Sequence, residues 1–185
     1  MPGKWIFEVG IVAETIPNAI RRVRAIFEQR PASAKHADAT AIARWDHDLR
    51  VISVDGNGTT IVTDMPTELG GTGDQVTPGW LMRAGLAACL ATRIAMEAAE
   101  RGVLLKHLEV NADSRSDLRG LLRMTDELGQ PVSPAPVQVQ LTVRASAENL
   151  SDDLLRAMIQ DCHRASPVAA AIESNIPIVL QIDLQ

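Results

Sequence analysis

The longest uninterrupted pattern in the chain runs from Thr77 to Gly102 and predicts a single long helix. Thr77 is a good N-cap, and Pro78 suits the first helical position, where a missing N–H costs nothing. Gly102 fits the position just beyond the last helical turn. Residues 84–91 are apolar on every side of this helix, which predicts burial all round. Cys89 lies in the middle of this run, among small side chains that let another backbone come close.

Alternation of apolar and polar residues predicts strands on both sides of the long helix. Before it, three short strands joined by turn-forming residues indicate an antiparallel meander. After it, three longer stretches alternate in the same way, and the clearest of them begins at Val137. The predicted strands are residues 41–45, 50–55, 59–63, 104–115, 137–144 and 176–183.

Two further helices are predicted near the end of the chain. Ser151 caps the first, and two acidic residues in its first turn favour the positive end of a helix. Ser166 and Pro167 begin a second, short helix by the same capping logic. Residues 116–136 mix charge, Gly and Pro, so we expect mostly loop with a helical turn at 118–124. The resulting order, βββ-α-ββ-α-β, indicates an α+β fold.

The first 39 residues form an arm ahead of the domain, which we assign to residues 40–185. Residues 5–12 have the composition of a strand, and residues 16–30 repeat apolar side chains at helical spacing. This amphipathic helix is expected to pack on the domain or on a partner subunit. A regulatory or membrane-surface arm is the alternative. Residues 31–40 have the composition of a linker.

Composition limits the partners and the location of the protein. The net charge is −5, with three Trp, two Phe and no Tyr, which argues against nucleic-acid and anionic-membrane partners. No signal peptide or membrane span is apparent in the sequence, so we expect a cytoplasmic protein. The Asp- and Gly-rich turn at residues 55–58 lacks the Glu that a calcium loop needs, because Pro66 stands at that position. We therefore expect no metal and no cofactor.

The two cysteines are the candidate chemistry. Cys89 lies in the long helix, and Cys162 lies on the apolar face of the helix that follows Ser151. In a reducing compartment, two thiols on facing helices suggest a pair that reduces peroxides or exchanges disulfides. Free cysteines are also among the most buried residues, so both thiols could equally be small core residues. The residues alone leave these two interpretations open.

An ordered set of short motifs resembles the OsmC/Ohr family, the osmotically induced and organic hydroperoxide resistance proteins. The resemblance covers residues 40–185 and follows the predicted order of elements. It implies an intertwined homodimer with antiparallel sheets around long buried helices and with active sites at the subunit interface. The motifs are Ala43-Arg44-Trp45, Val62-Thr63-Asp64-Met65-Pro66, Gly70-Gly71-Thr72, Thr77-Pro78, Leu86-Ala87-Ala88-Cys89-Leu90-Ala91 and Ser166-Pro167-Val168.

The resemblance also implies roles for individual residues. Cys89 matches the peroxidatic cysteine, which attacks the O–O bond, becomes a sulfenic acid and is resolved by a second cysteine. Ser166 occupies the position of the family's second cysteine, so Cys162, one helical turn earlier, is the candidate for that role. The family's arginine comes from the first hairpin, where Arg44 and Arg50 are both candidates to stabilise the thiolate. The family's glutamate, ten residues before the peroxidatic cysteine, is replaced by Gly79.

Together these observations predict a thiol-dependent peroxidase that reduces organic or hydrogen peroxides in oxidative-stress defence. Cys89 would be the nucleophile, and a thiol would serve as the reductant. The alternative is a non-catalytic OsmC-like protein, either structural or binding a small ligand in an apolar pocket at the dimer interface.

Overall fold

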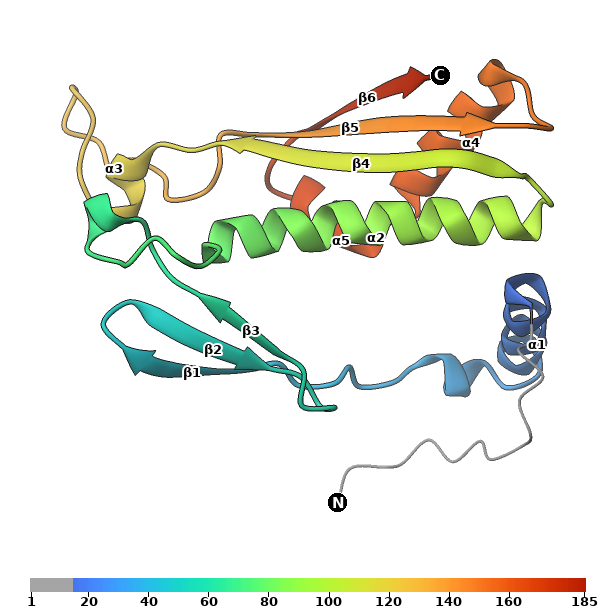
Figure 1. Ribbon diagram of the computed structural model, residues 1–185, viewed down its shortest axis with the longest axis horizontal. Helices are drawn as coiled ribbons and strands as arrows, with labels where there is room; N and C mark the ends of the chain where they lie inside the picture. The colour runs from blue at the N-terminus through green and yellow to red at the C-terminus, as the bar shows by residue number, and fades with distance from the viewer. Residues whose placement is uncertain (1–14) are drawn as a thin grey trace.

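The computed structural model describes residues 15–185 of the chain. It contains two three-stranded sheets, with the helix α2 (Pro78–Glu100) between them. The first sheet holds β1 (Ile42–His47), β2 (Arg50–Val54) and β3 (Thr60–Thr63) in that order, all antiparallel. Figure 1 shows this sheet on one side of α2 and the second sheet on the other.

The second sheet has β5 (Gln138–Ala147) at its centre, between β4 (Leu105–Arg115) and β6 (Ile178–Leu184). β4 pairs antiparallel to β5, with Val110 opposite Val143, whereas β6 runs parallel to β5. Two helices, α4 (Asp152–Arg164) and α5 (Pro167–Glu173), form the crossover that a parallel pairing requires. A short helix, α3 (Leu118–Leu121), interrupts the loop between β4 and β5.

The predicted caps of α2 are confirmed. The Thr77 hydroxyl accepts a hydrogen bond from the Trp80 amide over 3.1 Å. At the other end Gly102 adopts a positive φ of 65°. The amides of Gly102 and Val103 donate to the carbonyl groups of Ala99 and Ala98, which is the Schellman arrangement. The two ends of the helix are therefore fixed by local sequence.

The hydrophobic core lies between α2, the inner face of the second sheet, and α4. One stripe of α2 is fully buried, and it meets alternate residues of β5 and the apolar side of α4. Burial of each large aliphatic side chain in such a core contributes about 1.5–3 kcal/mol. The buried residues of these three elements are Leu86, Leu90, Ile94 and Ala98; Val139, Leu141, Val143 and Ala145; and Leu155, Met158, Ile159 and Cys162.

The opposite side of α2 departs from the expectation of burial all round. Gly85, Ala88, Thr92 and Ala95 are exposed, and they recur at intervals of three and four residues. These four residues are called the small-residue stripe below. The first sheet is also uncovered, because every residue of β1 is exposed and no residue of β2 is buried. Within residues 15–185, these two surfaces therefore have no hydrophobic partner.

The amphipathic helix predicted for the arm is confirmed as α1 (Ile16–Gln29). It lies beside the C-terminal half of α2 (Figure 1), and Arg24 Nη1 forms an ion pair with Glu100 Oε1 at 2.9 Å. The linker contains a short 3-10 helix, η1 (Pro31–Ala34). The strand expected at residues 5–12 lies outside the described residues.

Within residues 15–185, no helix is long and apolar enough to cross a membrane.

The first prediction tests the core of the second sheet. Leu90→Ala removes a fully buried side chain of α2 and should cost about 2–5 kcal/mol of unfolding free energy. Urea unfolding followed by circular dichroism measures the loss. Leu154→Ala is the matched control, since Leu154 is also helical but is 59% exposed. Equal losses for the two variants would contradict the proposed core.

Candidate functional site

The site is built around Cys89 in the middle of α2. The Ser166 hydroxyl lies 3.4 Å from the Cys89 sulfur and is oriented to donate to it. Ser166 is fully buried, whereas Cys89 is half-buried.

The sequence predicts that Ser166 caps the short helix α5, and α5 does begin at Pro167. However, the Ser166 side chain makes no capping hydrogen bond. Its carbonyl oxygen accepts from the Ala170 amide, which leaves the hydroxyl to face Cys89. Ser166 thus contacts the candidate nucleophile directly.

Cys162 lies one helical turn before Ser166 and is 1% exposed. Its thiol contacts the carbonyl oxygen of Arg93 at 3.7 Å. Burial raises the pKa of the Cys162 thiol to about 11, with the nearby charges of Arg93 and Glu97 acting in opposite directions. Cys162 is therefore a protonated thiol at neutral pH.

Arg93 lies one turn after Cys89 on α2. It forms an ion pair with Glu97, and Glu97 accepts a second hydrogen bond from Arg101 Nε at 2.7 Å. Burial acts to raise the pKa of Glu97, but the hydrogen bonds from Arg101 and Arg93 outweigh it and lower that pKa overall. Arg93 is thus part of a cluster of charged residues on α2 with Glu97 and Arg101.

Arg50, a candidate thiolate stabiliser, lies in a different cluster at the start of β2. Its guanidinium donates to Asp64 Oδ2 at 3.2 Å and to the Thr72 hydroxyl at 2.7 Å. Asp74 completes this Arg50 cluster through contacts with Arg50 and Thr72. Among the described residues, the buried Nε of Arg50 has no hydrogen-bond partner. The cluster therefore holds Arg50 rigidly but leaves one donor unused.

Asp64 is the buried acid of this cluster, being 2% exposed. The hydrogen bond from the Thr72 side chain is the largest of the effects that lower the pKa of Asp64 to about 2. Burial acts in the opposite direction, whereas hydrogen bonds from the Met65 and Thr72 amides and from Arg50 lower the pKa further. The glycine pair before Thr72 makes this geometry possible. A Cβ on Gly71 would lie 1.9 Å from the Met65 carbonyl oxygen, so only glycine fits.

The other candidate positions lie apart from Cys89. Arg44 is exposed on β1, and no polar partner for it is found among residues 15–185. Gly79 is exposed near the start of α2, where an added Cβ would lie 3.7 Å from Arg83 Nη1. Cys89 stands ten residues further on, about 15 Å along the helix axis. Within one chain, neither hairpin arginine makes a polar contact with the thiol.

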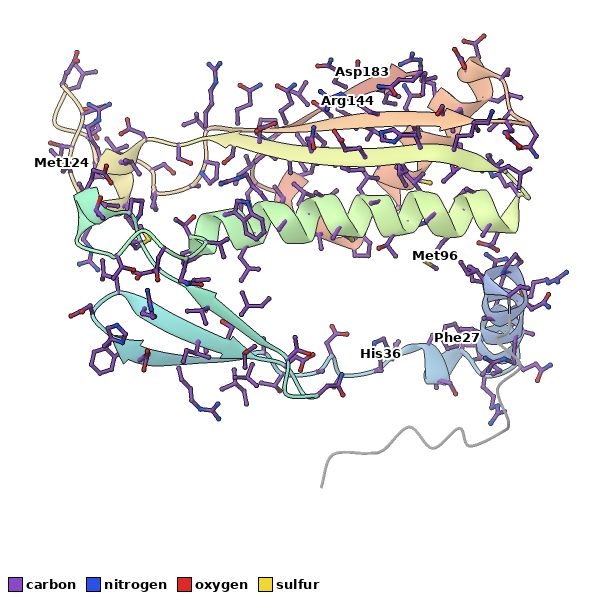
Figure 2. All side chains as sticks on the ribbon, in the orientation of Figure 1. Phe27, His36, Met96, Met124, Arg144 and Asp183 are labelled. Atoms are coloured by element: carbon purple, nitrogen blue, oxygen red, sulfur yellow. The ribbon has the colours of Figure 1, made fainter. Side chains whose placement is uncertain are left out.

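Residues 15–185 form a pocket on each of two sides of α2, and Cys89 lines neither of these pockets. One, of about 370 Å³, is almost wholly apolar, and Phe27 of α1 and Met96 of α2 line it (Figure 2). The other, of about 380 Å³, lies between the first half of α2 and β4, where Arg83 donates to the Ser114 hydroxyl. No group of three or more His, Cys, Asp or Glu suited to a metal occurs within residues 15–185.

Of the candidate site residues predicted from the sequence, Cys89 and Ser166 are in direct contact in the structure. The other candidates, Cys162, Arg44 and Arg50, do not contact Cys89 through a hydrogen bond. The structure adds acidic partners of Arg50 to which the sequence assigns no role. Those partners lie in and before the glycine-rich segment that precedes α2. The signal is the closely spaced Asp and Thr residues of this region: Asp64, Thr72 and Asp74.

Comparison with known proteins identifies the family. Residues 71–181, more than half of the chain, match the model of the OsmC-like protein family. The chain therefore belongs to the OsmC-like family. A search of curated proteins gives no significant match.

Solved structures share the fold at low sequence identity. An OsmC-like protein from Mycoplasma pneumoniae is 14% identical, with a TM-score of 0.66, and the match covers 81% of this chain and 99% of that chain. An organic hydroperoxide resistance protein OsmC from Legionella pneumophila is 22% identical, with a TM-score of 0.58 and coverages of 80% and 99%. An organic hydroperoxide resistance protein from Elizabethkingia anophelis is 18% identical, with a TM-score of 0.62 and coverages of 82% and 99%.

A pH-dependent prediction follows from the Arg50 cluster. The folded-state pKa of Asp64 is about 2, below its ordinary value of 3.8. Its contribution to stability is therefore complete above about pH 4 and is lost as the pH falls toward 2. Asp64→Asn should lower stability at neutral pH and reduce the loss between pH 4 and pH 2.

Denaturant unfolding over this pH range measures both effects. Asp38→Asn is the matched control, because the Asp38 side chain is 95% exposed and pairs with the exposed His36. An acid-induced loss in Asp64→Asn equal to that of the unsubstituted protein would contradict the role of Asp64.

Proposed function

We propose that this protein is a thiol-dependent peroxidase that reduces organic or hydrogen peroxides in oxidative-stress defence, with Cys89 as the nucleophile. The observation that carries the proposal is the half-buried Cys89 thiol under the hydroxyl of the fully buried Ser166. Membership of the OsmC-like family and the names of two structural relatives, organic hydroperoxide resistance proteins, support the same activity. Two free cysteines are consistent with action in a reducing compartment such as the cytoplasm.

The chemistry needs a thiolate and a small open space beside it. The Cys89 thiolate attacks one peroxide oxygen, so that an S–O bond forms as the O–O bond breaks. The alkoxide that leaves takes a proton and departs as an alcohol, and Cys89 becomes a sulfenic acid. The Ser166 hydroxyl is placed to hold the sulfur in position before attack.

We propose that the working form is a homodimer. The first sheet lies on the side of α2 away from the second sheet (Figure 1). The small-residue stripe lies on the face of α2 opposite the buried residues that pack on the second sheet. A three-stranded sheet without packing on one face has little independent stability. Small side chains spaced three and four residues apart let a second helix approach closely along α2. A second copy packed on the stripe would also cover the sheet.

The same dimer would give Arg44 or Arg50 a route to Cys89. Neither contacts the thiol within one chain, so a stabilising cation from the hairpin must come from the second copy. Arg50 is the better candidate of the two because its cluster fixes its guanidinium and leaves Nε unpaired. In this arrangement Asp64 and Asp74, the acidic partners of Arg50, take the place of the family glutamate, because Gly79 stands at the position of that glutamate.

The apolar pocket beside α1 favours a second candidate function, the binding of a small apolar ligand. Its lining is almost entirely hydrocarbon, and its charged lining residue, Arg24, is paired with Glu100. A binding role needs no peroxide chemistry, so the loss of peroxide reduction in a Cys89 variant separates the two functions.

The nucleophile is tested by substitution. Cys89→Ser should lower hydroperoxide consumption to the uncatalysed background, because a hydroxyl cannot replace the thiolate as a nucleophile here. Consumption of tert-butyl hydroperoxide with a small thiol present measures the activity, and circular dichroism confirms the fold. Undiminished turnover in a folded Cys89→Ser protein would contradict the proposal.

The dimer is tested by placing a charge on the stripe. Ala88→Arg should dissociate the dimer, because a guanidinium cannot be buried against a second α2 without a partner. Light scattering at micromolar concentration measures the mass. Ala170→Arg, at an exposed position of α5, should leave the mass unchanged. A monomeric, folded protein before any substitution would contradict the dimer.

A further inference from the structure

The two cysteines take part in different contacts between α2 and the segment formed by α4 and α5. In the first contact, the Ser166 hydroxyl lies 3.4 Å from the Cys89 sulfur. In the second, the Cys162 thiol lies 3.7 Å from the Arg93 carbonyl oxygen. Cys89 and Arg93 are four residues apart on α2, which corresponds to about 6 Å along the helix axis. Cys162 therefore lies opposite the turn of α2 that contains Arg93, one turn beyond Cys89.

We propose, on the basis of the peroxidase function above, that this protein is a one-cysteine peroxidase whose sulfenic acid is reduced by an external small thiol. Ser166 occupies the place in which a resolving sulfur would stand. Cys162 is a core residue and takes no part in the reaction. This departs from the two-cysteine cycle that the family resemblance implies.

A disulfide between the two cysteines would require α4 to move along α2. The S–S bond is about 2.05 Å long and needs Cα atoms within about 7 Å. Closing the gap means sliding the helices by about one turn against each other. Leu155, Met158 and Ile159 of α4 are fully buried in the same core, so such a slide would disrupt their packing. Close-packed interiors do not accommodate a shift of this size.

The state of the Cys162 thiol also opposes a resolving role. Thiol–disulfide chemistry requires a thiolate. Burial keeps Cys162 protonated at neutral pH, and only 1% of the residue is accessible. Cys89 is only half-buried, in contrast to Cys162. A small thiol therefore has access to Cys89 but not to Cys162.

The proposed cycle balances with two equivalents of an external thiol. Attack of the Cys89 thiolate on the peroxide gives an alcohol and the Cys89 sulfenic acid. A first small thiol forms an S–S bond with Cys89 and releases water. A second attacks that mixed disulfide, regenerates the Cys89 thiol and leaves as a small-molecule disulfide. The peroxide is the oxidant, and the two external thiols supply both electrons.

The test compares three full-length proteins treated with tert-butyl hydroperoxide: the unsubstituted protein, Cys162→Ser and Ser166→Cys. Peptide mapping without reductant locates disulfides, and hydroperoxide consumption with 2-mercaptoethanol measures turnover. The unsubstituted protein should form no Cys89–Cys162 disulfide. Ser166→Cys should form a disulfide between positions 89 and 166, because its sulfur would start within contact distance of Cys89. Cys162→Ser should keep its turnover within about twofold, since a serine hydroxyl can also donate to the Arg93 carbonyl.

Two results would overturn the one-cysteine cycle while leaving the peroxidase function intact. One is a Cys89–Cys162 disulfide in the oxidised, unsubstituted protein. The other is a loss of turnover of about tenfold or more in a folded Cys162→Ser protein, with Cys162→Ala as the second variant if the serine protein does not fold. If none of the proteins consumes hydroperoxide and position 166 forms no disulfide, the peroxidase function and the cycle both fail.

Discussion

One face of α2 packs against β5 and α4, and this packing sets the positions of the site and of the exposed side of the helix. Leu86, Leu90 and Ile94 fix the rotation of the helix about its axis by their complete burial. With that rotation set, Cys89 faces the α4–α5 connection, and the small-residue stripe faces away from the second sheet. The site and the proposed dimer surface are thus two consequences of the same core.

Much of the fold can be predicted from local sequence. Thr77 and Gly102 fix the ends of α2 through hydrogen bonds within a few residues, so capping rules locate them. Alternation along residues 139–145 identifies the central strand β5, since its inner residues are fully buried. All six strands of the domain are found within two or three residues of their predicted bounds. The parallel pairing of β6 depends on the crossover and is not evident from its own sequence.

The site is less predictable because it depends on how separate elements meet. Cys162 and Ser166 are four residues apart on one side of the α4–α5 segment, so periodicity alone cannot say which faces Cys89. The way in which that segment is aligned along α2 places Ser166, and not Cys162, beside Cys89. The acidic partners of Arg50 come from loops that have no periodic pattern, and Gly71 brings them together through a close backbone contact. The subunit arrangement is a property of two chains and lies beyond any pattern within one.

The central claim is that peroxide reacts at Cys89. The most direct measurement is mass spectrometry after one equivalent of tert-butyl hydroperoxide in the presence of dimedone, which traps sulfenic acids. A single dimedone adduct is expected, located on Cys89 and missing from Cys89→Ser. A Cys89 peptide that remains an unmodified thiol while the hydroperoxide is consumed would contradict it.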